Sequence, residues 1–268
     1  MNSKQAAGAL LAAYDGATRL VPPTDQDPAF DVDAAYAVAD DIRSRRIARG
    51  EKPRGYKIGF INRSIWPRYG VYGPIWGPIW DSTVTELAGP EGVASLASLV
   101  QPRLEPEIMF GFARPPGVGL GTDELLGCID WVAHGFEIVQ THFDDWRFRA
   151  ADTVADFALH GRLFVGPRMS IVKFVSAQTE LAAVAVELRR NGDAVDNGAG
   201  RAVLDGPLDA LRIWLDAMQS QVHDWPIRAG DIVTTGTLTD AWPLVAGEHW
   251  ETVLSDPRLP GLSLRIEA

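Results

Sequence analysis

The chain has 268 residues, of which 46% are hydrophobic and 22% are charged, and its formal net charge is −10 at pH 7. This acidic balance argues against nucleic acid and anionic membranes as partners, so we expect a small-molecule ligand. A single cysteine, Cys128, excludes an internal disulfide framework and suggests a core residue in a reducing, cytoplasmic compartment. No apolar stretch reaches the roughly 20 residues of a membrane-spanning helix, and we see no signal-peptide pattern.

Apolar residues recur at helical spacing near the N-terminus, which predicts helices over residues 4–19 and 33–49. Asp33 is a suitable N-cap for the second helix, and Gly50 is a suitable end. From Gly55 onward the pattern changes to short apolar runs broken by glycine and proline, which is typical of strands. These runs cover residues 56–60, 108–112, 136–140, 163–165, 184–189, 232–237 and 262–266.

Two further helices are predicted over residues 122–132 and 207–220. Asn191-Gly192 predicts a hairpin turn, because this pair readily adopts the positive φ values that such turns require. The expected fold class is therefore α+β. A small helical region at residues 1–54 would precede a β-rich domain at residues 55–268.

Glu105 and Glu107 stand one residue apart in the apolar run Leu104-Glu-Pro-Glu-Ile-Met-Phe110. Because side chains alternate along a strand, both would point to the same face, roughly 6.5–7 Å apart at their Cα atoms. Two buried carboxylates side by side are strongly unfavourable unless a cation or a proton neutralises them, and a divalent metal ion would do so. The alternative is an exposed edge strand with both carboxylates in water, with which Pro106 is compatible.

A third acidic residue, Glu137, interrupts the apolar run Gly135-Phe-Glu-Ile-Val-Gln140. Three carboxylates on adjacent strands would form an oxygen-rich site suited to Mg²⁺ or Mn²⁺, with about half of an octahedral shell left for water and substrate. Such an open shell is typical of a catalytic metal site. Alternatively, Glu137 forms a buried ion pair with Arg103 or Arg147.

Lys57 lies in a strand-like run, Arg54-Gly-Tyr-Lys-Ile-Gly-Phe60. Beside a metal it could act as a general acid, with burial and the cation lowering its pKa, or its stem could extend to solvent. Thr237 ends the run Thr234-Thr-Gly-Thr237, where hydroxyl and N–H groups could bind a carboxylate, or where a strand simply passes into a loop. The acid-rich residues 144–156 could form a solvated loop or a lid.

Six segments of the chain, taken in order, resemble the 2-keto-4-pentenoate hydratase/4-oxalocrotonate decarboxylase branch of the fumarylacetoacetate hydrolase superfamily. They are Tyr56-Lys-Ile-Gly59, Leu104-Glu-Pro-Glu-Ile108, Phe136-Glu-Ile-Val139, Asp152-Thr-Val-Ala-Asp156, Ala202-Val-Leu-Asp-Gly-Pro-Leu-Asp-Ala-Leu211 and Gly230-Asp-Ile-Val-Thr-Thr-Gly-Thr-Leu238. The resemblance covers residues 35–265, and the shared order makes it more specific than any single motif.

This resemblance implies the family's mixed β-roll with peripheral helices, in which residues 55–268 would be the catalytic domain. It implies that Glu105, Glu107 and Glu137 bind Mg²⁺ or Mn²⁺. Lys57 matches the family's active-site lysine, and Thr237 falls in the loop that receives the substrate carboxylate. The resemblance also implies a homo-oligomer.

The chain departs from the family pattern near the lysine. Hydratases of the family have a Pro-Asp-aromatic-Gly segment whose aspartate is thought to work with the lysine, but this chain has Pro74-Ile-Trp-Gly77, so Ile75 takes the place of the acid and becomes a candidate substrate contact. Asp81 is the nearest acidic replacement. After Asp156 the usual asparagine and small residues give way to Phe157-Ala-Leu-His160, which makes His160 a second candidate contact.

The implied reaction is a lyase step on a small 2-hydroxy-2,4-dienoate or its 2-oxo tautomer in aromatic-compound catabolism. In the leading hypothesis, a metal ion binds the C1 carboxylate and the C2 oxygen, Lys57 moves protons, and water adds to give a 4-hydroxy-2-oxo acid. Decarboxylation of a 4-oxalocrotonate-like diacid is the first alternative, because it requires no positioned water. Hydrolysis of an acylpyruvate, and a catalytically silent relative that binds metal or keto acid, are the others.

Overall fold

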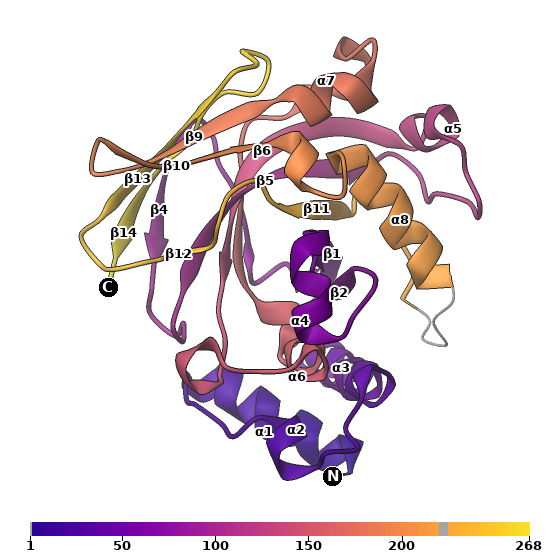
Figure 1. Cartoon of the computed structure of the whole chain (residues 1–268), viewed down its shortest axis with the longest axis vertical. Coiled ribbons are helices and arrows are strands. Elements are labelled where there is room, and N and C mark those ends of the chain that lie inside the picture. Colours follow the sequence, from indigo (N-terminus) through magenta and orange to yellow (C-terminus); the bar gives the residue numbers. More distant parts are fainter. Residues whose placement is uncertain (1, 220–224) are drawn as a thin grey trace.

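The N-terminal helices lie together at one end of the molecule (Figure 1). The computed structural model describes residues 2–219 and 225–268. The helices at this end are α1 (Ser3–Gly16), α2 (Pro23–Gln26) and α3 (Val32–Ala48), and α6 (Ala150–Ala155) packs against α3. This group therefore combines residues that are more than a hundred positions apart in the sequence.

Side-chain caps set the starts of the first and third helices. Asn2 accepts a hydrogen bond from the Lys4 N–H at the start of α1. Asp31 accepts one from the Ala34 N–H at the start of α3. The predicted cap at Asp33 is therefore wrong, since Asp33 lies inside the first turn of α3.

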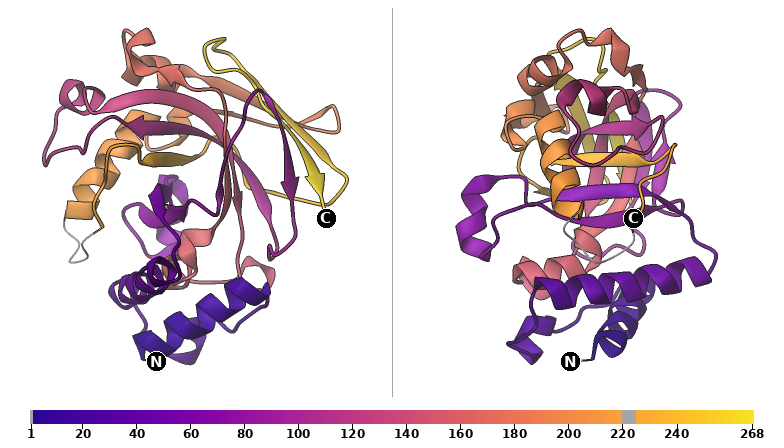
Figure 2. Two further views of the ribbon diagram at one scale, coloured as in Figure 1. Left: turned by 180° about the vertical axis from the view of Figure 1, so that it is seen from behind. Right: turned by 90° about the vertical axis from the view of Figure 1, so that its right-hand side faces the viewer.

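The larger of two sheets has nine strands in the order β2-β1-β11-β5-β6-β7-β3, with β12 paired to β5 and β8 paired to β6. Its strands are β1 (Pro53–Gly59), β2 (Ile75–Trp80), β3 (Val84–Glu86), β5 (Arg103–Phe112), β6 (Ile129–Val139), β7 (His160–Val165), β8 (Met169–Ser170), β11 (Ile232–Thr237) and β12 (Trp242–Pro243). Long, curved β5 and β6 pair antiparallel and form its centre. The sheet curls over the N-terminal helices (Figure 2).

The smaller sheet has five strands in the order β10-β9-β13-β14-β4. They are β4 (Glu91–Ser95), β9 (Ala185–Arg190), β10 (Asp193–Ala199), β13 (His249–Leu254) and β14 (Ser263–Glu267). Leu104 of β5 and Ile138 of β6 share a buried core with Trp250 and Leu264 of this sheet. The smaller sheet therefore covers the back of β5 and β6, and the opposite face of these strands is left to form a site.

The remaining helices are short, except for α8. They are α4 (Trp66–Tyr69), α5 (Thr122–Leu126), α7 (Ala177–Ala183) and α8 (Pro207–Gln219). Single 3₁₀ turns occur at Arg63–Ile65, Asp144–Trp146, Phe157–Leu159, Ile171–Lys173 and Gly200–Ala202. Tyr56 of β1 packs against Trp214 of α8, with 5.5 Å between the ring centroids. Because side chains alternate along β1, Lys57 points away from α8, toward the interior of the curled sheet.

The structure confirms the mixed α and β composition and the predicted strand runs, although several strands are longer than predicted. Asn191 and Gly192, with φ values of 55° and 89°, connect the antiparallel β9 and β10 as a hairpin. The helix predicted over residues 122–132 is wrong beyond Leu126, because Ile129 already pairs with Phe112 in the central sheet. The helix predicted over residues 207–220 is found as α8, and Ser220 lies outside the described residues.

Cys128 is buried, as expected, and its thiol donates to the Glu124 carbonyl oxygen. Among the described residues, no helix has the length and apolar character needed to cross a membrane.

Candidate metal centre and active site

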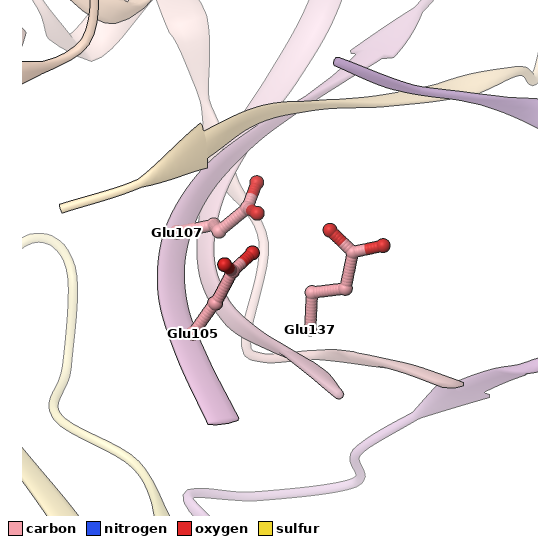
Figure 3. A group of neighbouring side chains, drawn as sticks. All are labelled: Glu105, Glu107 and Glu137. Atoms are coloured by element: carbon pink, nitrogen blue, oxygen red, sulfur yellow. The ribbon is translucent and has the colours of Figure 1, made fainter. Parts of the chain in front are cut away.

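Three glutamates of the central strands direct their carboxylates toward a common point (Figure 3). Glu105 and Glu107 lie on β5, and Glu137 lies directly opposite Glu105 on β6. Strand alternation places the two β5 residues on one face, and antiparallel pairing places Glu137 on the same face. One carboxylate oxygen of each residue lies within 4.8 Å of the other two. The structure therefore brings together the three glutamates that the sequence singles out.

The backbone of β11 holds Glu107 in place. The Gly236 N–H donates to Glu107 Oε2 at 2.7 Å. Gly236 has φ of +100°, and a β-carbon there would lie 2.4 Å from Ile61 Cγ1, so this position requires glycine. On the other side of β5, His134 connects the Glu107 carbonyl oxygen to Thr252 of the smaller sheet.

Burial and mutual repulsion make this cluster unfavourable without a cation. Glu107 and Glu137 are fully buried, whereas Glu105 is partly open to the adjoining pocket. Burial raises the pKa of Glu105 to about 7, and the charge of Glu137 adds to this effect. Burial and the two neighbouring carboxylates also raise the pKa of Glu107 well above its ordinary value. For Glu137, burial raises the pKa, but Lys57 and His160 outweigh burial and the net pKa is lowered.

The donor set fits a hard divalent cation. Glu107 Oε1 and Glu137 Oε2 are buried and make no hydrogen bond within the part of the chain that the structure describes. Carboxylate oxygens are the ligands that Mg²⁺, Mn²⁺ and Ca²⁺ prefer, and a divalent charge would offset most of the repulsion among three anions. Zinc sites usually include histidine or cysteine, and the cluster contains neither.

Lys57 of β1 completes the charged group. Its side chain is buried, and its Nζ lies 3.4 Å from Glu137 Oε2. Burial by itself lowers the pKa of Lys57, but the charges of the three glutamates outweigh burial and raise it. The lysine is therefore an ammonium in contact with the cluster, and its stem does not extend to solvent. Neither Arg103 nor Arg147 pairs with Glu137, and Arg147 instead pairs with Asp145.

His160 lies behind Glu137 rather than in the pocket. Its Nδ1 lies 2.8 Å from Glu137 Oε1, and its Nε2 lies 2.8 Å from Thr83 Oγ1. The ring is buried, and it is not among the residues that line the pocket. Burial lowers the pKa of His160 despite its contact with Glu137. With both nitrogens occupied, the histidine orients Glu137 and has no free group for a substrate.

Ile75 lines the pocket beside Lys57, and Asp81 does not. A β-carbon placed on Gly59 would lie 3.4 Å from Ile75 Cγ1 and 3.6 Å from Lys57 Nζ, so both side chains converge above Gly59. Antiparallel pairing puts Ile75 opposite Gly59 and puts the other end of β2 opposite Pro53. Asp81 follows that far end, is exposed, and accepts a hydrogen bond from the Lys52 N–H. The structure therefore does not bring Asp81 to Lys57 as a replacement acid.

A pocket of about 490 Å³ opens next to the glutamates. Thr237 lines it, and its hydroxyl donates to the Thr239 carbonyl oxygen. An aromatic group forms another part of the wall and consists of Phe60, Tyr69, Trp146 and Phe148. The pocket thus combines a charged floor with apolar surfaces large enough for a small organic acid.

Arg103 also lines this pocket, although the sequence interpretation considered it only as a partner for Glu137. Its guanidinium carbon lies 4.2 Å from the centroid of the Trp146 ring. The sequence does indicate that Arg103 lies at the site. It stands two residues before Glu105, and strand alternation places both residues on one face. For Trp146 no comparable signal exists, since it lies in an irregular segment.

The acid-rich residues 144–156 do not form one continuous solvated loop or lid, because residues 150–156 are buried. Asp152 is buried and accepts hydrogen bonds from the backbone N–H and the hydroxyl of Thr24. Asp156 is also buried and contacts His142 Nδ1. These two acids attach α6 to α2 and to the loop that follows β6, whereas Asp144 and Asp145 are exposed.

Known proteins similar to this chain are hydratases and decarboxylases. The chain is 32% identical to 2-hydroxyhexa-2,4-dienoate hydratase of Comamonas testosteroni over 249 residues, covering 91% of this chain and 90% of the relative. It is also 32% identical to 2-keto-4-pentenoate hydratase of Paraburkholderia xenovorans, covering 92% and 89%. A solved structure of 4-oxalocrotonate decarboxylase from Pseudomonas putida G7, complexed with magnesium and adipate, superimposes with a TM-score of 0.89 at 27% identity, covering 98% of this chain and 97% of that chain. No family model matches the sequence.

The chain belongs to the 2-keto-4-pentenoate hydratase/4-oxalocrotonate decarboxylase branch of the fumarylacetoacetate hydrolase superfamily. The predicted fold and the stated resemblance are thereby confirmed. Ile75, which departs from the expected Pro-Asp-aromatic-Gly pattern, lines the pocket near Lys57. The relatives include both hydratases and decarboxylases, so membership of the family does not by itself select one of the two reactions.

Proposed function

We propose that this protein is a divalent-metal-dependent lyase that acts on a small 2-hydroxy-2,4-dienoic acid or its 2-oxo tautomer. The observation that carries this proposal is the three-glutamate cluster in contact with the buried ammonium of Lys57 beside an organic-acid-sized pocket. A structural scaffold has no use for three mutually repelling buried carboxylates. The names of its relatives, which are hydratases of such dienoates and a decarboxylase, support the same chemistry.

We infer that Glu105, Glu107 and Glu137 hold Mg²⁺ or Mn²⁺. Solved relatives are complexed with magnesium, calcium and manganese, which supports a hard divalent ion at such a site. When bound, the ion supplies Lewis-acid polarisation of the C2 oxygen and stabilises the enolate charge that develops there. Gly236 and His160 fix the orientations of Glu107 and Glu137, so two ligands are held in place before the ion arrives.

The protein side chains provide binding and proton transfer. Lys57 Nζ holds the proton that moves between the C2 oxygen and the carbon chain of the substrate. Thr237 lies at the end of β11, where the neighbouring backbone can contact the C1 carboxylate and where the Thr237 hydroxyl can join it by giving up its hydrogen bond to the Thr239 carbonyl oxygen. Ile75 adds an apolar surface to the pocket near Lys57.

Hydration is the first candidate reaction, because the two relatives at 32% identity are hydratases. In this reaction the oxygen of water bonds to C4 and its hydrogen goes to the carbon chain. Decarboxylation is favoured by a specific observation, namely that Ile75 takes the β2 position near Lys57 at which the family pattern has an aspartate. Loss of CO₂ from a 2-oxo-3-hexenedioate breaks a carbon–carbon bond and leaves the electron pair on the enolate, so it requires no group that activates water.

Two assays test the proposal. With Mg²⁺, the protein is given 2-hydroxypenta-2,4-dienoate while the dienol absorbance is followed, and then 2-oxo-3-hexenedioate while CO₂ release is measured. We expect turnover in at least one assay, and we expect EDTA or Glu107→Ala to abolish it. Absence of turnover in both, with oxalate still bound to the Mg²⁺ protein, would overturn the lyase assignment in favour of a silent relative.

A further inference from the structure

Arg103 is a pocket cation with no ion-pair partner among the described residues. Its guanidinium makes no hydrogen bond and no ion pair with any residue of the chain in the ranges 2–219 and 225–268. Lys57, the other cation among the described residues that line the pocket, already forms an ion pair with Glu137. The Arg103 side chain is partly buried. A partly desolvated cation of this kind gains from an incoming anion.

The position of Arg103 relative to the glutamates is set by the central strands. Arg103, Glu105 and Glu107 are alternate residues of β5, so they share one face, with Arg103 at the outer end of the row. Val139 lies opposite Arg103, and Glu137 lies opposite Glu105. Alternate residues of a strand are about 6.5–7 Å apart at their Cα atoms, which is comparable to the length of a six-carbon acid. A ligand with one end at the glutamates can therefore reach Arg103 with the other.

Trp146 presents the guanidinium for recognition of a planar anion. The guanidinium carbon lies over the indole ring, 4.2 Å from the ring centroid. Trp146 is itself fixed, because its Nε1 donates to the Gln101 carbonyl oxygen at 3.1 Å and the Asp145 N–H donates to the Gln101 side chain. This contact uses no N–H group of the guanidinium, so the N–H groups are left for a carboxylate, which they can bind in a bidentate manner.

We propose that Arg103 binds a second carboxylate at the far end of the substrate, so that the pocket is built for 2-oxo dicarboxylic acids. This inference rests on the proposed function, because it assumes that the C1 end of the acid lies at the three glutamates. In hydration the distal carboxylate is a recognition group only, whereas in decarboxylation Arg103 binds the same carboxylate that then leaves as CO₂. The competing occupant is an apolar tail, which would contact Phe60, Tyr69 and Phe148.

Binding of two unreactive acids of equal length to the Mg²⁺ protein tests the proposal by isothermal titration calorimetry. 2-Oxoadipate carries the second carboxylate, and 2-oxohexanoate lacks it. We expect the wild-type protein to bind 2-oxoadipate about 10- to 100-fold more tightly, which is the range for a hydrogen-bonded charged pair. Arg103→Met should lose this preference while binding oxalate normally, and Arg103→Lys should keep part of it.

Arg168→Met is the matched control. Arg168 also stacks on a tryptophan, with its guanidinium carbon 4.4 Å from the Trp131 ring centroid, and it pairs with Glu86 away from the pocket. This variant should keep the full preference for 2-oxoadipate. Equal binding of both acids to the wild type, or a preference that survives Arg103→Met, would overturn the role of Arg103. Failure of oxalate and both oxo acids to bind the Mg²⁺ protein would instead overturn the proposed function.

Discussion

Glu105→Gln tests whether the glutamate cluster destabilises the fold until a cation binds. Burial and the charge of Glu137 raise the pKa of Glu105 from 4.5 to about 7. Since one pKa unit corresponds to about 1.4 kcal/mol, ionised Glu105 lowers the free energy of unfolding of the metal-free protein by about 3 kcal/mol above pH 7. This penalty fades as the pH falls from about 7 toward 4.5, because the folded protein takes up the proton before the unfolded chain does.

Urea unfolding at two pH values measures this effect. In EDTA at pH 8, Glu105→Gln should be more stable than the wild type by up to about 3 kcal/mol, and at pH 5 the difference should shrink below about 1 kcal/mol. In excess Mg²⁺ the order should reverse, since the wild type gains binding free energy that the variant loses. Glu91→Gln, at an exposed position of β4, is the control and should change neither value. A variant that is less stable than the wild type in EDTA at pH 8 would refute the reasoning.

Three further substitutions probe the centre. Lys57→Met keeps an apolar stem and removes the ammonium, so we expect kcat to fall about 10²- to 10⁴-fold. Calorimetry should show that the Mg²⁺ affinity is retained. A near-normal kcat would remove the lysine from the mechanism. Ile75→Asp places an acid beside Lys57, so the ratio of hydration to decarboxylation rates should rise, and an unchanged ratio would show that this position does not select the reaction. Gly236→Ala forces a side chain into positive φ against Ile61, so thermal unfolding should show a loss of about 1–3 kcal/mol and calorimetry should show weaker Mg²⁺ binding. Normal Mg²⁺ affinity in this variant would mean that the Gly236 N–H does not orient Glu107.

The arrangement of the glutamates follows from a local rule that can be applied to sequence. Residues i and i+2 of a strand share a face, so Glu105 and Glu107 lie together wherever their strand lies. That Glu137 stands opposite Glu105 depends on the register between β5 and β6, which the chain order of two apolar runs suggests but does not determine. The hairpin at Asn191-Gly192 was predictable for a similar local reason, since few other pairs tolerate two positive φ values.

The errors in prediction occur where distant parts of the chain decide the outcome. The apolar run from Cys128 to Val132 is compatible with a helix or a buried strand, and pairing of β6 with β5 selects the strand. Asp81 is near Ile75 in sequence, but β2 separates them because it is extended and pairs along the whole of β1. His160 is directed away from the pocket by Thr83, a residue 77 positions earlier. None of these partners is visible within a short sequence window.

The surroundings of Lys57 indicate how the two candidate reactions are separated. Its Nζ contacts Glu137, which His160 orients, so the residues that stabilise an enolate and move its proton are present. Ile75 also lies near Lys57 above Gly59, and its side chain can neither donate nor accept a proton. Enolate formation is common to hydration and decarboxylation, whereas activation of water is needed for hydration alone. A substrate that carries its own leaving group therefore requires nothing at the position of Ile75, and such a substrate would supply the second anion that Arg103 is placed to bind.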